Sequence, residues 1–107
     1  MVKKITYFFM KEINKDNITP CKVSNYAKRL QISETKLRDF VKKTTNKTPK
    51  EIIEIHKISI AKKLIMNTNY SISDIAYKMG FKDSNNFTRF FKTKTGFTPL
   101  NYRKTKL

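Results

Sequence analysis

Several residue types are scarce in this sequence of 107 residues, and each scarcity excludes a class of protein. Cys21 is the only cysteine, so no disulfide can form within the chain, and its surroundings predict a small buried core thiol. No apolar run approaches the roughly 20 residues of a membrane span, and no secretory hydrophobic segment follows Met1. We therefore expect an intracellular bacterial protein.

Catalytic groups are equally scarce. His56 is the single histidine, and it has no second ligand, acid or nucleophile nearby, so we interpret it as a packed or partly exposed imidazole. The sequence contains no nucleophile–base pair, metal-binding cluster or glycine-rich phosphate loop. The prediction is a protein that is not an enzyme, with no catalytic residue, no metal site and no cofactor.

Acidic residues are few as well. Eight Asp and Glu stand against 24 Lys and Arg, which leaves a formal charge of +16. So many like charges repel one another in a compact state and attract polyanions. The expected partners are nucleic acid, an anionic membrane surface or an acidic protein. The length allows one domain, or two very small ones that share a core.

What the sequence does contain is an internal repeat. CKVSNYAKRLQI (21–32) aligns with YSISDIAYKMGF (70–81), and DFVKKTTNKTPKEI (39–52) aligns with RFFKTKTGFTPLNY (89–102). Stacked repeat architectures need three or more copies, so two copies indicate a paired module.

Each copy is predicted to fold as a helix, a tight turn and a second helix. In the second copy Ser71 and Asp83 are suitable N-cap residues, and Gly80 and Gly96, the only two glycines, stand where the two helices end in the left-handed conformation. In the first copy the corresponding residues are Gln31, Ser33 and Asn46. Each copy is followed by a Thr-Pro pair that begins another helix, at 48–49 and 98–99.

The remaining pattern predicts an all-α fold of about seven helices. A first helix is expected over about 2–14. A longer helix over about 48–67 is apolar on more than one face and is therefore expected to be buried between two bodies. The expected organisation is a first subdomain at 1–47, a bridging helix at 48–67 and a second subdomain at 68–107, which together form one compact domain.

The stretch MGFKDSNNFTRFFK (79–92) indicates what the second copy does. A helical wheel with Phe87, Phe90 and Phe91 turned inward places Asn85, Arg89 and Lys92 outermost. This arrangement is a helix-turn-helix pattern, because an α-helix fits the major groove of DNA and reads base edges with its polar face. A bridging helix of ~30 Å is also close to the ~34 Å turn of B-DNA.

Two segments carry a family resemblance, SISDIAYKMGFKDSNNFTRFFKTKTGFTPLNYRK (71–104) and KISIAKKLI (57–65). Their pattern I-A, G-F, F-x-R-x-F-K, G-x-T-P-x-x-Y-R resembles the AraC/XylS-type transcriptional regulators. The resemblance covers nearly the whole chain. It implies two helix-turn-helix units that place their recognition helices in successive major grooves. It also implies activation through RNA polymerase, and a sensory or receiver domain if the chain is part of a longer regulator.

The resemblance and the helical wheels give candidate contacts with double-stranded DNA. The predicted base-reading residues are Thr35, Lys36, Arg38, Asp39, Ser84, Asn85, Asn86 and Arg89. The predicted phosphate contacts are Lys42, Lys43, Thr88 and Lys92.

Asp39 departs from the usual family pattern, because it occupies the position of Arg89 in the other copy. Its carboxylate has two interpretations: it accepts a hydrogen bond from cytosine N4, or it pairs with Lys43 four residues on.

The expected function is sequence-specific DNA binding by a transcription regulator in the cytoplasm, associated with the nucleoid. The alternative is a nonspecific architectural or nucleoid protein, which the charge also fits. A membrane-surface protein is disfavoured because Pro49, Gly80, Gly96 and Pro99 interrupt the long amphipathic helix that such a protein needs.

Overall fold

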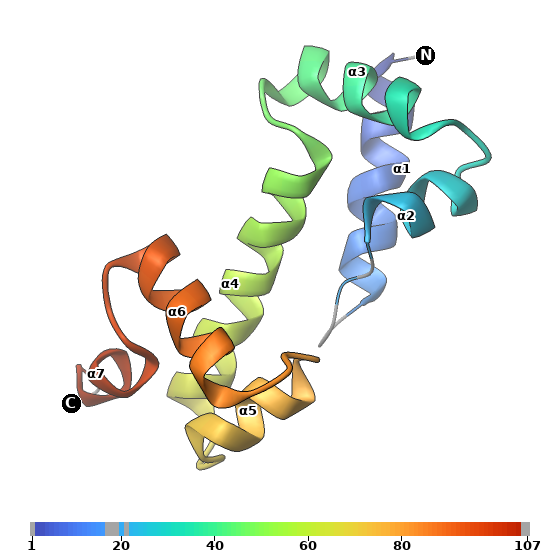
Figure 1. Cartoon of the computed structure of the whole chain (residues 1–107). Coiled ribbons are helices and arrows are strands. Elements are labelled where there is room, and N and C mark those ends of the chain that lie inside the picture. Colours follow the sequence, from blue (N-terminus) through green and yellow to red (C-terminus); the bar gives the residue numbers. More distant parts are fainter. Residues whose placement is uncertain (1, 17–19, 21, 106–107) are drawn as a thin grey trace. The chain divides into compact units, whose positions relative to one another are not determined.

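The computed structural model describes residues 2–16, 20 and 22–105, which form helices joined by short turns and contain no strand (Figure 1). Cys21 lies outside these residues, so its expected burial stays a prediction. The all-α expectation is confirmed. The helices are α1 (Val2–Lys15), α2 (Val23–Arg29), α3 (Glu34–Thr45), α4 (Pro49–Asn67), α5 (Ile72–Lys78), α6 (Ser84–Thr95) and α7 (Pro99–Lys104).

The chain divides into two compact units, Met1–His56 and Lys57–Leu107. The boundary falls inside α4, so the first half of this helix belongs to one unit and the second half to the other. The finer division into subdomains at 1–47 and 68–107 with a separate bridging helix stays a prediction.

In the first unit, α1 packs chiefly on α3 and closes a core in which Phe9, Tyr26 and Leu37 are fully buried. Phe9 and Tyr26 meet edge to face, with ring centroids 5.6 Å apart. The Tyr26 hydroxyl donates to an Asp16 carboxylate oxygen at 2.5 Å, so the buried ring keeps its polar end satisfied. His56 Nε2 lies 3.3 Å from the Asp16 carbonyl oxygen, which confirms a partly buried, packed imidazole.

In the second unit, α5 and α6 close a core around Ile75, Phe87 and Phe91, all with no exposed surface. Phe90 is only half-buried, and its ring packs against that of Phe81 with centroids 5.4 Å apart. Tyr102 packs on the same core, with its ring centroid 5.4 Å from that of Phe91.

Helix α4 contributes Ile52 and Ile53 to the first core and Ile60 and Ile65 to the second. The expected burial of this apolar helix holds for these four residues and is wrong at Ile55, whose exposed fraction is 55%. The reason is helical geometry, because Ile55 follows the core-packed Ile53 by two residues, or about 200° around the helix. The two side chains therefore project from opposite sides of α4.

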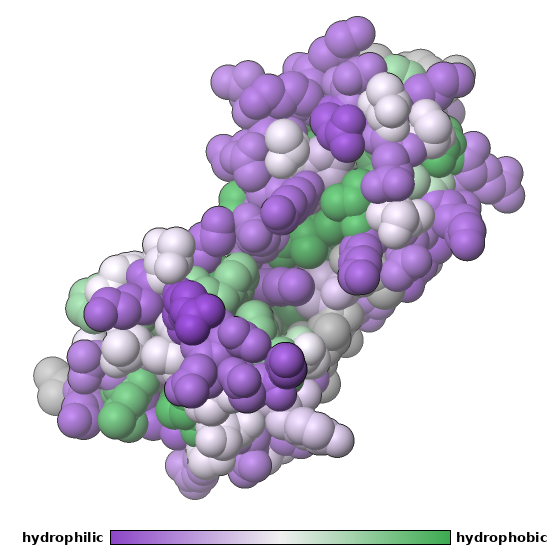
Figure 2. Space-filling model, viewed as in Figure 1, coloured by the Kyte–Doolittle hydropathy of each residue, from purple (hydrophilic) through white to green (hydrophobic). Residues whose placement is uncertain are grey.

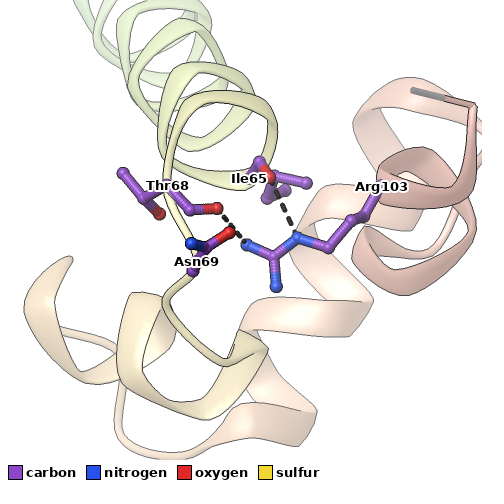
Figure 3. A pocket seen from close by; sticks show the side chains of 4 residues that line it. All are labelled: Ile65, Thr68, Asn69 and Arg103. Atoms are coloured by element: carbon purple, nitrogen blue, oxygen red, sulfur yellow. Dashed lines mark hydrogen bonds between the residues drawn. The ribbon is translucent and has the colours of Figure 1, made fainter. Parts of the chain in front are cut away.

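Arg103 of α7 donates hydrogen bonds to backbone carbonyls at the C-terminal end of α4 (Figure 3). Its Nε donates to the Ile65 carbonyl at 2.9 Å, and its Nη2 donates to the Thr68 carbonyl at 3.4 Å. The last carbonyls of a helix have no partner within the helix and carry partial negative charge, so a guanidinium is well suited to them. With Asn69, these three residues line a depression of about 180 Å³.

None of the helices in the described ranges combines the length and hydrophobicity that a transmembrane segment requires.

Candidate nucleic-acid interface

The two helix-turn-helix turns have the same hydrogen bonds. In the first unit the Ile32 N–H donates to the Ala27 carbonyl at 3.1 Å, and in the second the Phe81 N–H donates to the Ala76 carbonyl at 3.0 Å. This six-residue closure is the Schellman motif, which ends a helix through one left-handed residue. That residue is Gln31 (φ 59°) in the first unit and Gly80 (φ 82°) in the second, as predicted from the repeat.

The helices that follow these turns, α3 and α6, have equal lengths and equivalent ends. Ser33 Oγ accepts from the Lys36 N–H at 3.1 Å, and Asp83 Oδ1 accepts from the Asn86 N–H at 2.8 Å. Asn46 ends α3 and Gly96 ends α6, both in the left-handed conformation. The four predicted caps of α3 and α6 are therefore confirmed, and each helix is held in place at both ends.

Each of these helices buries one side and exposes the other. Leu37 and Val41 of α3 are fully buried, and so are Phe87 and Phe91 of α6. Figure 2 shows hydrophilic side chains over much of the visible surface. The exposed candidates are Thr35, Lys36, Arg38, Asp39, Lys42, Lys43, Asn85, Arg89 and Lys92. The half-buried candidates are Ser84, Asn86 and Thr88.

The two lysines at matching positions have different surroundings. Lys42 Nζ donates to the Asn46 carbonyl at 3.2 Å, at the C-terminal end of its own helix. The Lys92 ammonium has no hydrogen-bond or ion-pair partner among the described residues. An ammonium held at a helix C-terminus is favoured there by the helix dipole. Lys42 must therefore give up a contact to reach a phosphate, and Lys92 need not.

Asp39 makes no ion pair with Lys43, although the two stand four residues apart on α3. Ion pairs in the described part of the chain include those of Glu12 with Lys15 and Arg29, and of Asp16 with Arg29. Of the two interpretations of Asp39, the pairing with Lys43 is thus not observed. The carboxylate is exposed and has no such partner on its own helix.

The junction between α3 and α4 carries a reciprocal cap. The Thr48 N–H and hydroxyl donate to Glu51 Oε1 at 3.2 and 3.1 Å, and the Glu51 N–H donates to Thr48 Oγ1 at 3.1 Å. The backbone N–H of Thr48, followed by its hydroxyl, lowers the pKa of the Glu51 carboxyl below its ordinary value of 4.5. The positions equivalent to these two residues are Thr98 and Asn101. The second unit therefore has no ionisable group in this cap.

Arg103 has no predicted role from sequence spacing. Its two acceptors lie 38 and 35 residues earlier in the chain, and no local periodicity links an arginine in α7 to the end of α4. The only signal is its place in the resemblance pattern.

Comparison with known proteins identifies this architecture. A family model described as "Helix-turn-helix domain" matches residues 26–105. The chain is 35% identical over 80 residues to the uncharacterised HTH-type transcriptional regulator YtdP of Bacillus subtilis, covering 75% of this chain and 10% of that protein. It is 30% identical over 82 residues to the HTH-type transcriptional activator RhaR of Yersinia pseudotuberculosis, covering 77% and 28%.

Among solved structures, the DNA-binding domain of the global transcriptional factor AdpA, in complex with a target DNA, has a TM-score of 0.76. It is 17% identical, and the match covers 97% of this chain and 90% of that one. A similarity at this level of identity concerns the fold. The fold and the site thus define a protein with two helix-turn-helix units.

The chain belongs to the AraC/XylS-type helix-turn-helix family of transcription regulators. It spans about a tenth of the length of YtdP and less than a third of that of RhaR.

Proposed function

We propose that this domain binds specific sequences of double-stranded DNA and regulates transcription, with α3 and α6 as the recognition helices in successive major grooves. The observation that carries the proposal is the duplication of one cap-and-turn geometry, which holds two helices with buried apolar sides and exposed polar sides. A nonspecific binder has no need of two helices whose outer faces are rich in hydrogen-bonding groups.

In the second unit, α6 presents amides, hydroxyls and one guanidinium. Asn85 and Asn86 match the N6 and N7 groups of adenine, and Arg89 matches the O6 and N7 groups of guanine. Ser84 also faces the bases. Thr88 and Lys92 contact the phosphate backbone, which fixes the register of the helix without reading the sequence.

In the first unit, α3 presents mainly charged groups. Thr35, Lys36, Arg38 and Asp39 are the base-reading residues, and Lys42 and Lys43 are the phosphate contacts. With the charge of +16, these lysines give the binding a strong dependence on salt.

Two partners follow from the family and belong to the proposal. The first is RNA polymerase, through which the domain activates transcription. The second is a sensory or receiver domain, since the relatives that the chain matches are much longer. The proposed place of action is the nucleoid of the cytoplasm, and the proposed activity involves no enzymatic step.

The test is selection of bound sequences from a random duplex pool at about 150 mM salt, where nonspecific phosphate contacts are weakened. We expect enrichment of two short blocks about one helical turn apart. A single block would limit sequence reading to one unit. Tight binding at low salt without enrichment would replace the proposal with an architectural role.

A further inference from the structure

We propose that Asp39 is a specificity-determining residue that selects cytosine in the half of the DNA site that α3 reads. This inference rests on the proposed function and adds to it the identity of one base and the side chain that chooses it.

The position of Asp39 on α3 comes first. Leu37 and Val41 define the buried side of the helix. At about 100° per residue, Thr35, Asp39 and Lys42 then project from the opposite side, within roughly 60° of one another. Asp39 is exposed on this side, in the second turn of a helix whose N-terminal end is expected to enter the groove.

The chemistry of the carboxylate then restricts the base. An ionised carboxylate only accepts hydrogen bonds. In the major groove guanine shows two acceptors, and thymine shows an acceptor and a methyl group, so both repel or exclude it. Adenine offers a donor next to the N7 acceptor, whereas cytosine offers the N4 donor alone. Cytosine is therefore the base that a carboxylate recognises without an opposing acceptor.

The surroundings of Asp39 leave this carboxylate available. Neither Lys43 nor any other cation forms an ion pair with it among the described residues. Lys42, three residues on, has its ammonium at the Asn46 carbonyl. A helix that needed Asp39 only for stability would be expected to pair it at i+4, where cations on such helices commonly lie.

The second unit supplies a natural contrast. Arg89 occupies the position equivalent to Asp39 and has the opposite charge. A guanidinium donates to guanine, and a carboxylate accepts from cytosine. The two copies thus use one position of the repeat to read opposite members of the G·C pair, and the target is expected to be asymmetric.

The experiment begins with the sequences selected by the unaltered chain. In the best site, each C·G pair of the α3 block is changed in turn to T·A, which replaces the N4 donor by the O4 acceptor. At one of these positions we expect affinity to fall roughly tenfold, the size of a typical single mismatch. The Asp39→Asn variant should lose this discrimination, because an amide can donate to O4.

Glu34→Gln is the matched control. Glu34 lies on the same helix, carries the same charge and projects about 100° away from Thr35. The control should keep the discrimination between C·G and T·A, while any general effect of removing one negative charge appears in both variants. Thermal unfolding of both variants confirms that they are folded.

The outcomes separate the two proposals. If Asp39→Asn discriminates against T·A as strongly as the unaltered chain does, the cytosine role is overturned and the proposed function stands. An equal rise in affinity for all sequences would also overturn it, since Asp39 would then only repel phosphates. Failure to select any sequence would overturn both proposals.

Discussion

Gln31 has an unfavourable backbone conformation that a single substitution relieves. Its φ of 59° lies in the left-handed region, where a side chain costs about 1–2 kcal/mol relative to glycine. Part of that gain is lost because glycine has more freedom in the unfolded chain. Gln31→Gly should therefore raise the free energy of unfolding by about 1 kcal/mol or less, as measured by urea denaturation.

Gly96→Ala gives the opposite test in the second unit. A Cβ at Gly96 would meet no atom within 4 Å, so its φ of 85° is the only source of strain. We expect Gly96→Ala to lower the free energy of unfolding by about 1–2 kcal/mol, as measured by urea denaturation. If Gly96→Ala were neutral, strain at a positive φ would not explain the choice of residues at these helix ends.

Arg89 and Lys92 lie three residues apart on α6, and their substitutions should have different effects on DNA binding. Arg89→Ala should weaken binding to the selected sequence by ~1–3 kcal/mol and relax specificity at one position.

Lys92→Ala should weaken binding to all sequences alike. It should also reduce the slope of the logarithm of the binding constant against the logarithm of the salt concentration by about one. Lys42→Ala should change the slope by less, because Lys42 already contacts Asn46. Binding titrations over a range of salt concentrations check all three, and equal slopes for the two lysine variants would refute the difference between them.

At the scale of the element, the start of α4 should be sensitive to acid. Glu51 has a folded-state pKa lowered by Thr48, so its contribution to stability is complete above the ordinary pKa of 4.5 and is lost as pH falls through the lower, folded-state value. Glu51→Gln should accelerate amide exchange at Thr48 at neutral pH, and this difference should shrink as the pH falls below 4.5 through the lower, folded-state pKa.

The corresponding cap of α7 uses Thr98 and the unionisable Asn101, with the Asn101 N–H donating to Thr98 Oγ1. Because Asn101 cannot ionise, the cap of α7 should not respond to the acid that weakens the Glu51 cap, and it serves as the internal control. A difference between Glu51→Gln and the unaltered chain that persists unchanged in acid would show that the amide, and not the charge, determines the effect.

At the scale of the whole molecule, two separate cores predict two separable responses. Leu37 is fully buried in the first core and Phe87 in the second. Leu37→Ala should lower the free energy of unfolding by about 2–5 kcal/mol, and Phe87→Ala should lower it by about 3–5 kcal/mol. Hydrogen exchange should rise mainly in α1–α3 for the first variant and mainly in α5–α6 for the second. An equal rise throughout the chain for either variant would mean that the two units unfold as one.

The sequence predicted much of this fold because the repeat and the caps are local signals. Ser33, Asp83 and Gly96 each act on a backbone within a few residues, so their roles follow from spacing alone. Other contacts depend on competition between side chains or on distant segments. Asp39 does not pair with Lys43, Lys42 contacts Asn46, and these choices between neighbours could not be read from the pattern.

The matched ends of α3 and α6 make their outer faces exchangeable. Both helices have 12 residues, a side-chain N-cap and a left-handed C-cap, so their exposed positions can be altered while their buried positions and ends stay as they are. Placing Asn at Thr35 and Arg at Asp39 would copy the proposed reading face of Asn85 and Arg89 into the first unit. Such a chain would favour a direct repeat in place of an asymmetric site, which makes the duplication a ready starting point for redesigned DNA specificity.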